Sequence, residues 1–256
     1  MTDAMRMRDH LGRIDPAARV HERVTLGKNV TIAAGATIYE NAMIGDGAYI
    51  GPNVTIGEPL AAFYSDPAYE NPPTVIGPGS IIRSGTVIYA GTTSGPRLQT
   101  GHDAMIREYT EFGEGCGFGT FAMSDGRVKF GDGARIHYAV CISQGTVFGK
   151  RVHVYPYAAF PDSLHPPCRR HLEAPVIGDE TIILLHAIVL PRVKVGARCL
   201  VGAHTVVTED VPDGMAVVGS PGKIVKRTAD IPCKVTPGHH PYPWTEAQEK
   251  EAEARK

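Results

Sequence analysis

The chain has 256 residues, which is long enough for one large domain with a substantial core. Lys and Arg number 26 against 27 Asp and Glu, so the net charge of −1 gives no strong attraction to nucleic acid or to an anionic membrane. The five cysteines form no CxxC pair, and there is neither an apolar leader nor a run near the ~20 apolar residues of a membrane span, so we expect a cytoplasmic protein with reduced thiols.

A repeat of six residues begins after a short lead-in at residues 1–13. Every sixth residue over 14–56 is aliphatic, and a small or β-branched residue stands four positions after it. The same spacing of large apolar residues returns over 76–160 and again over 177–207. Only three positions on this period are not large and apolar, namely Ser94, Thr100 and Ser124.

Two proline-rich insertions separate the three runs, at about residues 58–75 and 161–176. Long loops on a rigid scaffold often carry function. We therefore expect one repeat domain at 14–227 with two inserted loops, followed by a tail at 228–256. Residues 242–256 are rich in Glu, Ala and Lys, which predicts a short helix that covers the end of the repeat.

A period of six fits neither an α-helix nor a simple alternating hairpin. It fits a short strand followed by a tight corner, and three such units close a triangular coil of 18 residues. Large aliphatic residues would fill the interior, small residues would occupy the corners, and parallel strands would stack about 4.8 Å apart. The sequence therefore predicts an all-β protein, a parallel β-helix.

Residues 18 positions apart should then lie at the same place on adjacent coils. This spacing stacks His137 on Tyr155 and His186 on His204. It also gathers polar side chains along one corner, directly before the second insertion. We select this corner as a candidate site because a histidine, carboxylates and an amide converge there. Its members are Arg107, Glu108, Gln144 and Asp162, with His165 on the insertion itself.

Several segments resemble the hexapeptide-repeat acyltransferases that modify nucleotide-linked amino sugars. They are TGHDAMIRE at 100–108, RIH at 135–137, YPY at 155–157, and the closing segments at 202–212 and 217–223. The resemblance covers about residues 14–227. It implies that the coil is left-handed, against the usual right-handed rule for parallel crossovers. It also implies a homotrimer that binds acyl-CoA, such as acetyl-CoA, in the groove between neighbouring prisms.

The resemblance implies catalytic and binding residues as well. A loop histidine followed by proline acts as the base in related enzymes, and the match here is His165, with His102 as the second candidate. Such a residue can take the proton that an amine loses as it attacks a thioester. The small-molecule acceptor, possibly a nucleotide sugar, would contact His137, Arg107, Glu108, Gln144, Asp162 and Tyr155. Acyl-CoA would contact His186, Ala187, Ala203, His204, Lys223 and Lys226.

The late coils depart from the family pattern, because Leu184, Leu185 and His186 stand where small residues are usual. O-acyl transfer therefore stays open beside N-acyl transfer, as does unrelated chemistry or a scaffold role on the same fold. A zinc site like that of the carbonic anhydrases of this fold is a further alternative, although the characteristic ligand spacing is not visible. We expect no metal, no nucleic acid and no membrane as partners.

Overall fold

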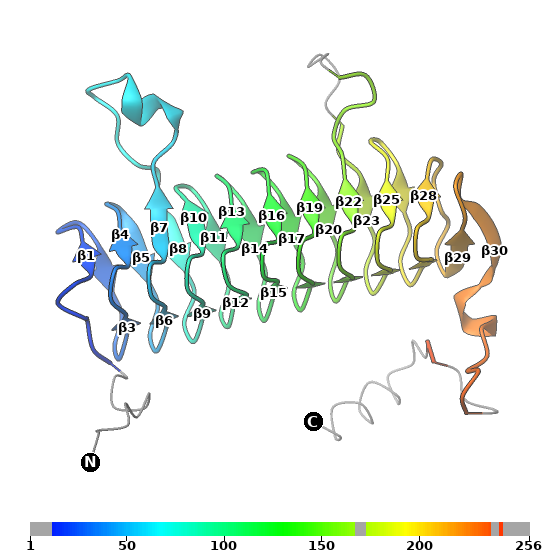
Figure 1. Cartoon of the computed structure of the whole chain (residues 1–256), viewed down its shortest axis with the longest axis horizontal. Helices are drawn as coiled ribbons and strands as arrows, with labels where there is room; N and C mark the ends of the chain where they lie inside the picture. The colour runs from blue at the N-terminus through cyan, green and yellow to red at the C-terminus, as the bar shows by residue number, and fades with distance from the viewer. Residues whose placement is uncertain (1–11, 167–172, 237–240, 243–256) are drawn as a thin grey trace.

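The computed structural model describes residues 12–166, 173–236 and 241–242. It is an elongated prism with three flat faces, each made by one sheet of short strands, and two loops stand out from it (Figure 1). The chain runs around the prism in the order B, C, A, where A, B and C name the three sheets. The helix expected at 242–256 lies almost entirely outside the described residues.

Sheet B has ten strands: β1 (Arg19–Val20), β4 (Thr37–Ile38), β7 (Thr55–Glu58), β10 (Val87–Tyr89), β13 (Met105–Ile106), β16 (Met123–Ser124), β19 (Cys141–Ile142), β22 (Ala159–Phe160), β25 (Ile188–Val189) and β28 (Val206–Val207). Sheet C has nine strands: β2 (Thr25–Leu26), β5 (Ala42–Ile44), β8 (Thr74–Ile76), β11 (Thr93–Ser94), β14 (Glu111–Phe112), β17 (Lys129–Phe130), β20 (Val147–Phe148), β23 (Val176–Ile177) and β26 (Lys194–Val195).

Sheet A has eleven strands: β3 (Thr31–Ile32), β6 (Tyr49–Ile50), β9 (Ile81–Ile82), β12 (Gln99–Thr100), β15 (Gly117–Phe118), β18 (Arg135–Ile136), β21 (His153–Val154), β24 (Ile182–Ile183), β27 (Leu200–Val201), β29 (Met215–Val218) and β30 (Lys223–Arg227). All pairings between successive coils are parallel, and Gln99 pairs with Gly117 eighteen residues later. The prediction of an all-β parallel β-helix is confirmed, and its strand arrangement is that of a left-handed β-helix.

Large apolar side chains fill the interior, as the period of six predicts. Phe112, Phe130 and Phe148 stack on one another from coil to coil along sheet C, with ring centroids 4.6 and 5.1 Å apart. The small corner residues are also buried, and Ala36 and Ala42 are both 0% exposed. The fold is therefore stabilised mainly by one continuous apolar column inside the prism.

The three polar positions of the repeat stay in register and point inward. Ser94 is 7% exposed and Ser124 is 0% exposed. Each of these hydroxyls has a partner inside the prism: the Ser124 Oγ atom lies 3.1 Å from Thr110 Oγ1, and the Gly77 amide donates to Ser94 Oγ. Thr100 Oγ1 accepts from the Arg83 amide. Because a buried hydroxyl costs little once it is hydrogen-bonded, the repeat tolerates these interruptions.

The corner between sheets C and A explains why glycine recurs there. A Cβ atom on Gly113 would lie 2.7 Å from the backbone nitrogen of Asp132 on the next coil. The carboxylate of Asp132 accepts a hydrogen bond from the Glu114 amide at 3.0 Å, which ties the two coils together. Glycine at this corner thus lets consecutive coils approach closely enough for the side chain of one to bind the backbone of the other.

Both inserted loops leave the prism at the corner between sheets B and C, and they project on the same side (Figure 1). Loop 1 connects β7 to β8 and contains the short 3-10 helix η2 (Ala61–Tyr64). It is held by the buried Asn71, whose amide donates to the Gly57 carbonyl and whose Oδ1 atom accepts from the Tyr69 hydroxyl. Loop 2 connects β22 to β23.

The regular coils end at β28, and strands β29 and β30 follow within the expected domain limit at residue 227. The last two strands, β29 and β30, pair antiparallel at the edge of sheet A, so they close the end of the prism in place of a further coil. The 3-10 helix η3 (Thr228–Asp230) follows, and Thr228 Oγ1 donates to the Arg198 carbonyl. Among the residues that the structure describes, no helix is long and apolar enough to cross a membrane.

Candidate functional site

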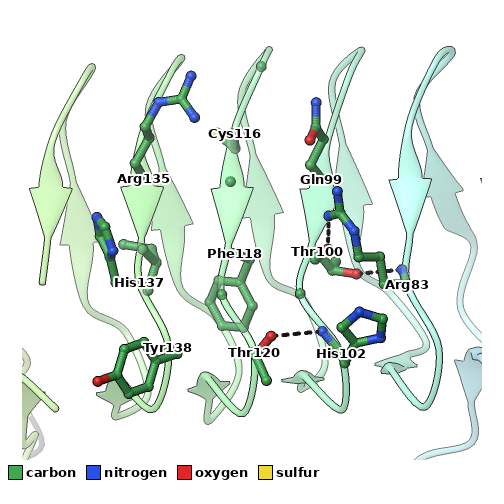
Figure 2. Close-up of a pocket in the computed structure, with 15 residues that line it drawn as sticks. Arg83, Gln99, Thr100, His102, Cys116, Phe118, Thr120, Arg135, His137 and Tyr138 are labelled. Atoms are coloured by element: carbon green, nitrogen blue, oxygen red, sulfur yellow. Dashed lines mark hydrogen bonds between the residues drawn. The ribbon is translucent and has the colours of Figure 1, made fainter. Parts of the chain in front are cut away.

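A shallow depression of about 440 Å³ lies on sheet A, over strands β12, β15 and β18. Its floor is β15, where Gly117 takes the outward position and Gly119 follows at the corner. Figure 2 shows Arg83, Gln99 and His102 on one side of this floor and Arg135, His137 and Tyr138 on the other. We call this feature the basic depression, because two arginines and two histidines line it and no Asp or Glu does.

His102 lies at the corner between sheets A and B, on the β12 side of the depression. Its Nδ1 atom is 2.8 Å from Ser84 Oγ on the preceding coil, and its backbone amide donates to Thr120 Oγ1 at 3.1 Å. Residues of three successive coils therefore fix its position. Because Nδ1 is engaged by the Ser84 hydroxyl, Nε2 is the ring nitrogen left for a ligand. The hydroxyl can donate or accept, so Nε2 can be either the protonated or the unprotonated nitrogen.

His137 lies on the opposite side of the floor, at the same corner. Its ring stacks on Tyr155 of the next coil with centroids 4.6 Å apart, as the 18-residue spacing predicts. Burial, and then the nearby Arg135 guanidinium, lower the pKa of His137 below its ordinary value. Both effects disfavour the imidazolium, so they favour the neutral ring, which can accept a proton.

An aromatic column continues along this corner towards the C-terminus. Tyr138 meets Tyr157 edge to face at 5.2 Å, Tyr157 stacks on His186 at 4.9 Å, and His186 stacks on His204 at 4.8 Å. The last pair confirms the predicted stack. Tyr138 and Tyr157 are about half exposed, at 47% and 48%. The column therefore forms an exposed aromatic ridge that leads away from the basic depression.

The other residues expected to bind CoA lie on these late coils. Ala203 is exposed next to His204, but Ala187 is 0% exposed, so its methyl group faces the interior of the prism. Lys223 and Lys226 are exposed on β30. Leu185, one of the departures from the family pattern, is 42% exposed on the same corner.

The polar residues predicted near the second insertion lie along a different corner, between sheets B and C. Arg107 Nη1 is 3.0 Å from Asp125 Oδ1 on the next coil, and Arg107 Nε is 3.0 Å from Glu108 Oε2. The guanidinium also lies over the Tyr89 ring, 5.5 Å from its centroid. Asp125 follows Arg107 by 18 residues, so this ion pair joins equivalent positions of adjacent coils. Gln144 occupies the same corner one coil beyond Asp125, partly exposed.

Loop 2 places Asp162 at its base and His165 further out. The Glu173 amide donates to the Asp162 carbonyl at 3.1 Å, which closes the base of the loop. His165 is exposed and, within the described part of the chain, forms no hydrogen bond or ion pair. The sequence therefore located two groups of candidate residues correctly in the repeat, but within one chain sheet B separates His165 from His102 and His137.

Sequence reasoning missed the two arginines of the basic depression and its bare floor. Arg83 and Arg135 were not selected because an exposed arginine is common on any surface. The available clue was Gly117, since the outward position of this strand lacks a side chain. The described residues contain no group of three or more His, Cys, Asp or Glu that could hold a metal ion.

The fold and its repeat define the class as a hexapeptide-repeat β-helix. Residues 23–58 match the family model described as bacterial transferase hexapeptide (six repeats). This match covers early coils of the prism, and the same repeat of six continues through the later coils.

Among curated proteins, the chain is similar to 2,3,4,5-tetrahydropyridine-2,6-dicarboxylate N-acetyltransferase of Staphylococcus aureus (strain JH9), with 35% identity over 83 residues. That stretch covers 32% of this chain and 34% of the relative, so the alignment spans about a third of the relative's length.

Among solved structures, the chain is similar to LpxA, a UDP-N-acetylglucosamine acyltransferase from Bacteroides fragilis 9343, at 18% identity and a TM-score of 0.46, over 83% of this chain and 74% of that one. PerB from Caulobacter crescentus, solved with CoA and GDP-perosamine, matches at 19% identity and a TM-score of 0.25, over 83% of this chain and 56% of that one.

Proposed function

We propose that the protein is an acyltransferase that moves an acetyl or similar acyl group from acyl-CoA to the amine of a small molecule. The observation that carries this proposal is the pair His102 and His137, which lie on opposite sides of an open, glycine-floored depression. The similarity to an N-acetyltransferase over 83 residues supports transfer to an amine. That relative acts on a dicarboxylate, and a nucleotide-linked amino sugar is the acceptor that the sequence motifs favour.

The chemistry follows from the properties of the two groups. The acceptor nitrogen attacks the thioester carbonyl, the C–S bond breaks, and CoA leaves as the thiolate while nitrogen loses one proton. A neutral histidine within hydrogen-bond reach takes that proton and returns it to the departing sulfur. His137, whose pKa is lowered, favours its neutral form and can accept a hydrogen bond from the attacking nitrogen. A backbone amide would stabilise the oxyanion of the tetrahedral intermediate.

The separation of the candidate residues supports a trimer. Within one chain, the basic depression and the aromatic ridge lie at the A–B corner, whereas loop 2 with His165 and the Arg107 group lie at the B–C corner. Three prisms around a three-fold axis would place the B–C corner of one chain against the A–B corner of the next. In this arrangement His165 of one subunit acts as the base at the depression of its neighbour, with acyl-CoA along the ridge of His186, Ala203 and His204.

Mixing two inactive variants tests both the function and the shared site. His165→Ala and His102→Ala are each assayed for release of CoA thiol with acetyl-CoA and a panel of nucleotide-linked amino sugars and amino dicarboxylates. We expect both variants to lose activity. Denatured and refolded together in equal amounts, they should regain about a quarter of the wild-type rate, because each site draws its loop and its depression independently from the two pools.

Two controls make the result decisive. Each variant refolded alone must stay inactive, and a sizing measurement must show the same assembly for both variants and wild type. If the mixture stays inactive while both assemblies are intact, the shared site is wrong. If wild type releases no thiol with any acceptor and binds no acetyl-CoA at millimolar concentration, the acyltransferase proposal fails.

A further inference from the structure

The basic depression carries an excess of positive charge that proton transfer alone does not require. Two guanidiniums, of Arg83 and Arg135, and two imidazoles line it, and no carboxylate does. Two carboxylates at the adjacent C–A corner are already engaged, because Glu114 pairs with Arg97 and Asp132 pairs with Lys150 at 3.2 Å. Asp103, which follows His102, is exposed and does not line the depression. Within the described part of the chain, no carboxylate forms an ion pair with Arg83 or Arg135.

The two arginines also differ from their neighbours in what they contact. Arg97 and Arg151, on coils of the same prism, are each ion-paired with a glutamate. Arg83 donates to the Thr100 carbonyl, which turns its guanidinium over the depression (Figure 2). Arg135 is exposed, and its guanidinium forms no hydrogen bond or ion pair with any residue that the structure describes. Both side chains thus have donors left for a ligand.

The floor of the depression leaves room for that ligand. A Cβ atom placed on Gly117 would meet no other atom within 4 Å, so the space above β15 is open. The flanking strands β12 and β18 are two strand spacings apart, about 10 Å in a parallel sheet. A small molecule can lie flat on the backbone of β15 between the two cationic sides.

We propose that the basic depression binds an acyl acceptor that carries two anionic groups, phosphate or carboxylate, with Arg83 and Arg135 each contacting one of them. Guanidinium binds the oxygens of both groups through paired hydrogen bonds, whereas an uncharged acceptor would leave both guanidiniums without an anionic partner. The inference rests on the proposed function in that it assigns the anion to the acceptor. The inference defines the substrate class as amines that carry two anionic groups.

Direct binding tests the site without any turnover. The full chain is titrated calorimetrically with inorganic pyrophosphate and, separately, with glutarate, which distinguishes phosphate from carboxylate. We expect saturable binding of at least one probe. Arg135→Gln should weaken it about tenfold or more, the loss of one charge-assisted contact. Gly117→Val should abolish it, since the valine side chain fits the backbone and fills the floor.

Arg198→Gln is the matched control, because it removes the same charge from an exposed arginine at the C–A corner, between β26 and β27 and several coils from the depression. We expect this variant to bind the probe within about twofold of wild type, as a distant surface charge is screened by salt. Equal weakening in both arginine variants would mean a general field effect and would overturn the site. So would the absence of saturable binding for both probes, or binding that survives Gly117→Val.

The source of the anion is settled by competition. Saturating CoA should leave the bound probe in place if the site belongs to the acceptor, and displacement by CoA would reassign it to the phosphates of the donor and overturn this inference. The two proposals fail separately. Probe binding without any thiol release contradicts only the acyltransferase function, whereas thiol release that Gly117→Val does not change contradicts only the anion site.

Discussion

His137 lies flat against Tyr155 of the next coil, with ring centroids 4.6 Å apart and ring planes 13° from parallel. The contact covers one face of the imidazole, and burial is the largest cause of its lowered pKa. The stack therefore helps to keep His137 in the neutral form that a proton acceptor needs.

Replacing Tyr155 should reverse this effect. In Tyr155→Ala the imidazole gains solvent, so we expect the pKa of His137 to rise towards 6.5, its ordinary value. An NMR titration of the histidine ring protons measures the change. Tyr157→Ala is the control, because Tyr157 contacts Tyr138 and His186 instead and should leave the His137 titration unchanged. An unaltered His137 pKa in Tyr155→Ala would show that the stack does not bury the ring in solution.

The same shift predicts a pH dependence of stability. Because the folded-state pKa of His137 lies below its unfolded value, the unfolded chain binds more protons at mildly acidic pH. The contribution is fully present above about pH 6.5 and is lost as the pH falls through the folded-state pKa. Chemical unfolding at pH 5 and pH 8 should therefore show a smaller difference in His137→Gln than in wild type. A difference of the same size in both proteins would contradict this origin.

The buried hydroxyl pair Thr110 and Ser124 predicts two unequal losses of stability. Thr110 Oγ1 donates to the Arg107 carbonyl at 2.8 Å, so Ser124 must donate to Thr110. Ser124→Ala removes one hydrogen bond and should cost about 1 kcal/mol of unfolding free energy. Thr110→Val leaves the Ser124 hydroxyl and the Arg107 carbonyl both without this partner, and should cost about 2–4 kcal/mol. Denaturant unfolding measures both, and a larger loss in Ser124→Ala would refute the assigned donor direction.

Two glycines of neighbouring positions predict opposite responses to alanine. A Cβ atom at Gly113 would lie 2.4 Å from Asp132 Oδ1 and 2.7 Å from its backbone nitrogen, so Gly113→Ala should destabilise by about 1–3 kcal/mol. At Gly117 the Cβ atom has open space, and the lower entropy of the unfolded chain should stabilise Gly117→Ala by roughly 0.4–1 kcal/mol. Thermal unfolding of the two variants side by side gives the sign of each change.

The repeat made most of the fold predictable. The six-residue period and the size of the side chains predicted the strands, the corners and the stacking of His137 on Tyr155. This was possible because every coil packs the same kinds of side chains at the same positions. The antiparallel closure by β29 and β30 was not predictable, since Met215–Val218 follows a corner of irregular length. The interior hydroxyls appeared as failures of the pattern, and only their hydrogen bonds explain why the register continues through them.

The candidate site was predictable only in part. The sequence places His102 and His137 on one corner, but it does not show that Gly117 opens a depression between them, because that depends on three adjacent coils at once. Nor does the sequence show that His165 lies beyond sheet B from both histidines. The sequence motifs thus named candidate residues. The structure shows that these candidates lie at two different corners of the prism.

The two loops leave the same corner, five strand spacings apart along sheet B, from β7 to β22. At about 4.8 Å per spacing this separation is roughly 24 Å. The coils between the two loops share one cross-section. Deleting a single 18-residue coil would therefore bring the loops closer by one strand spacing, and duplicating one would move them one spacing apart. The orientation of every corner would stay the same. The chain is thus a scaffold of adjustable length, on which the distance between two inserted segments is encoded as a whole number of coils.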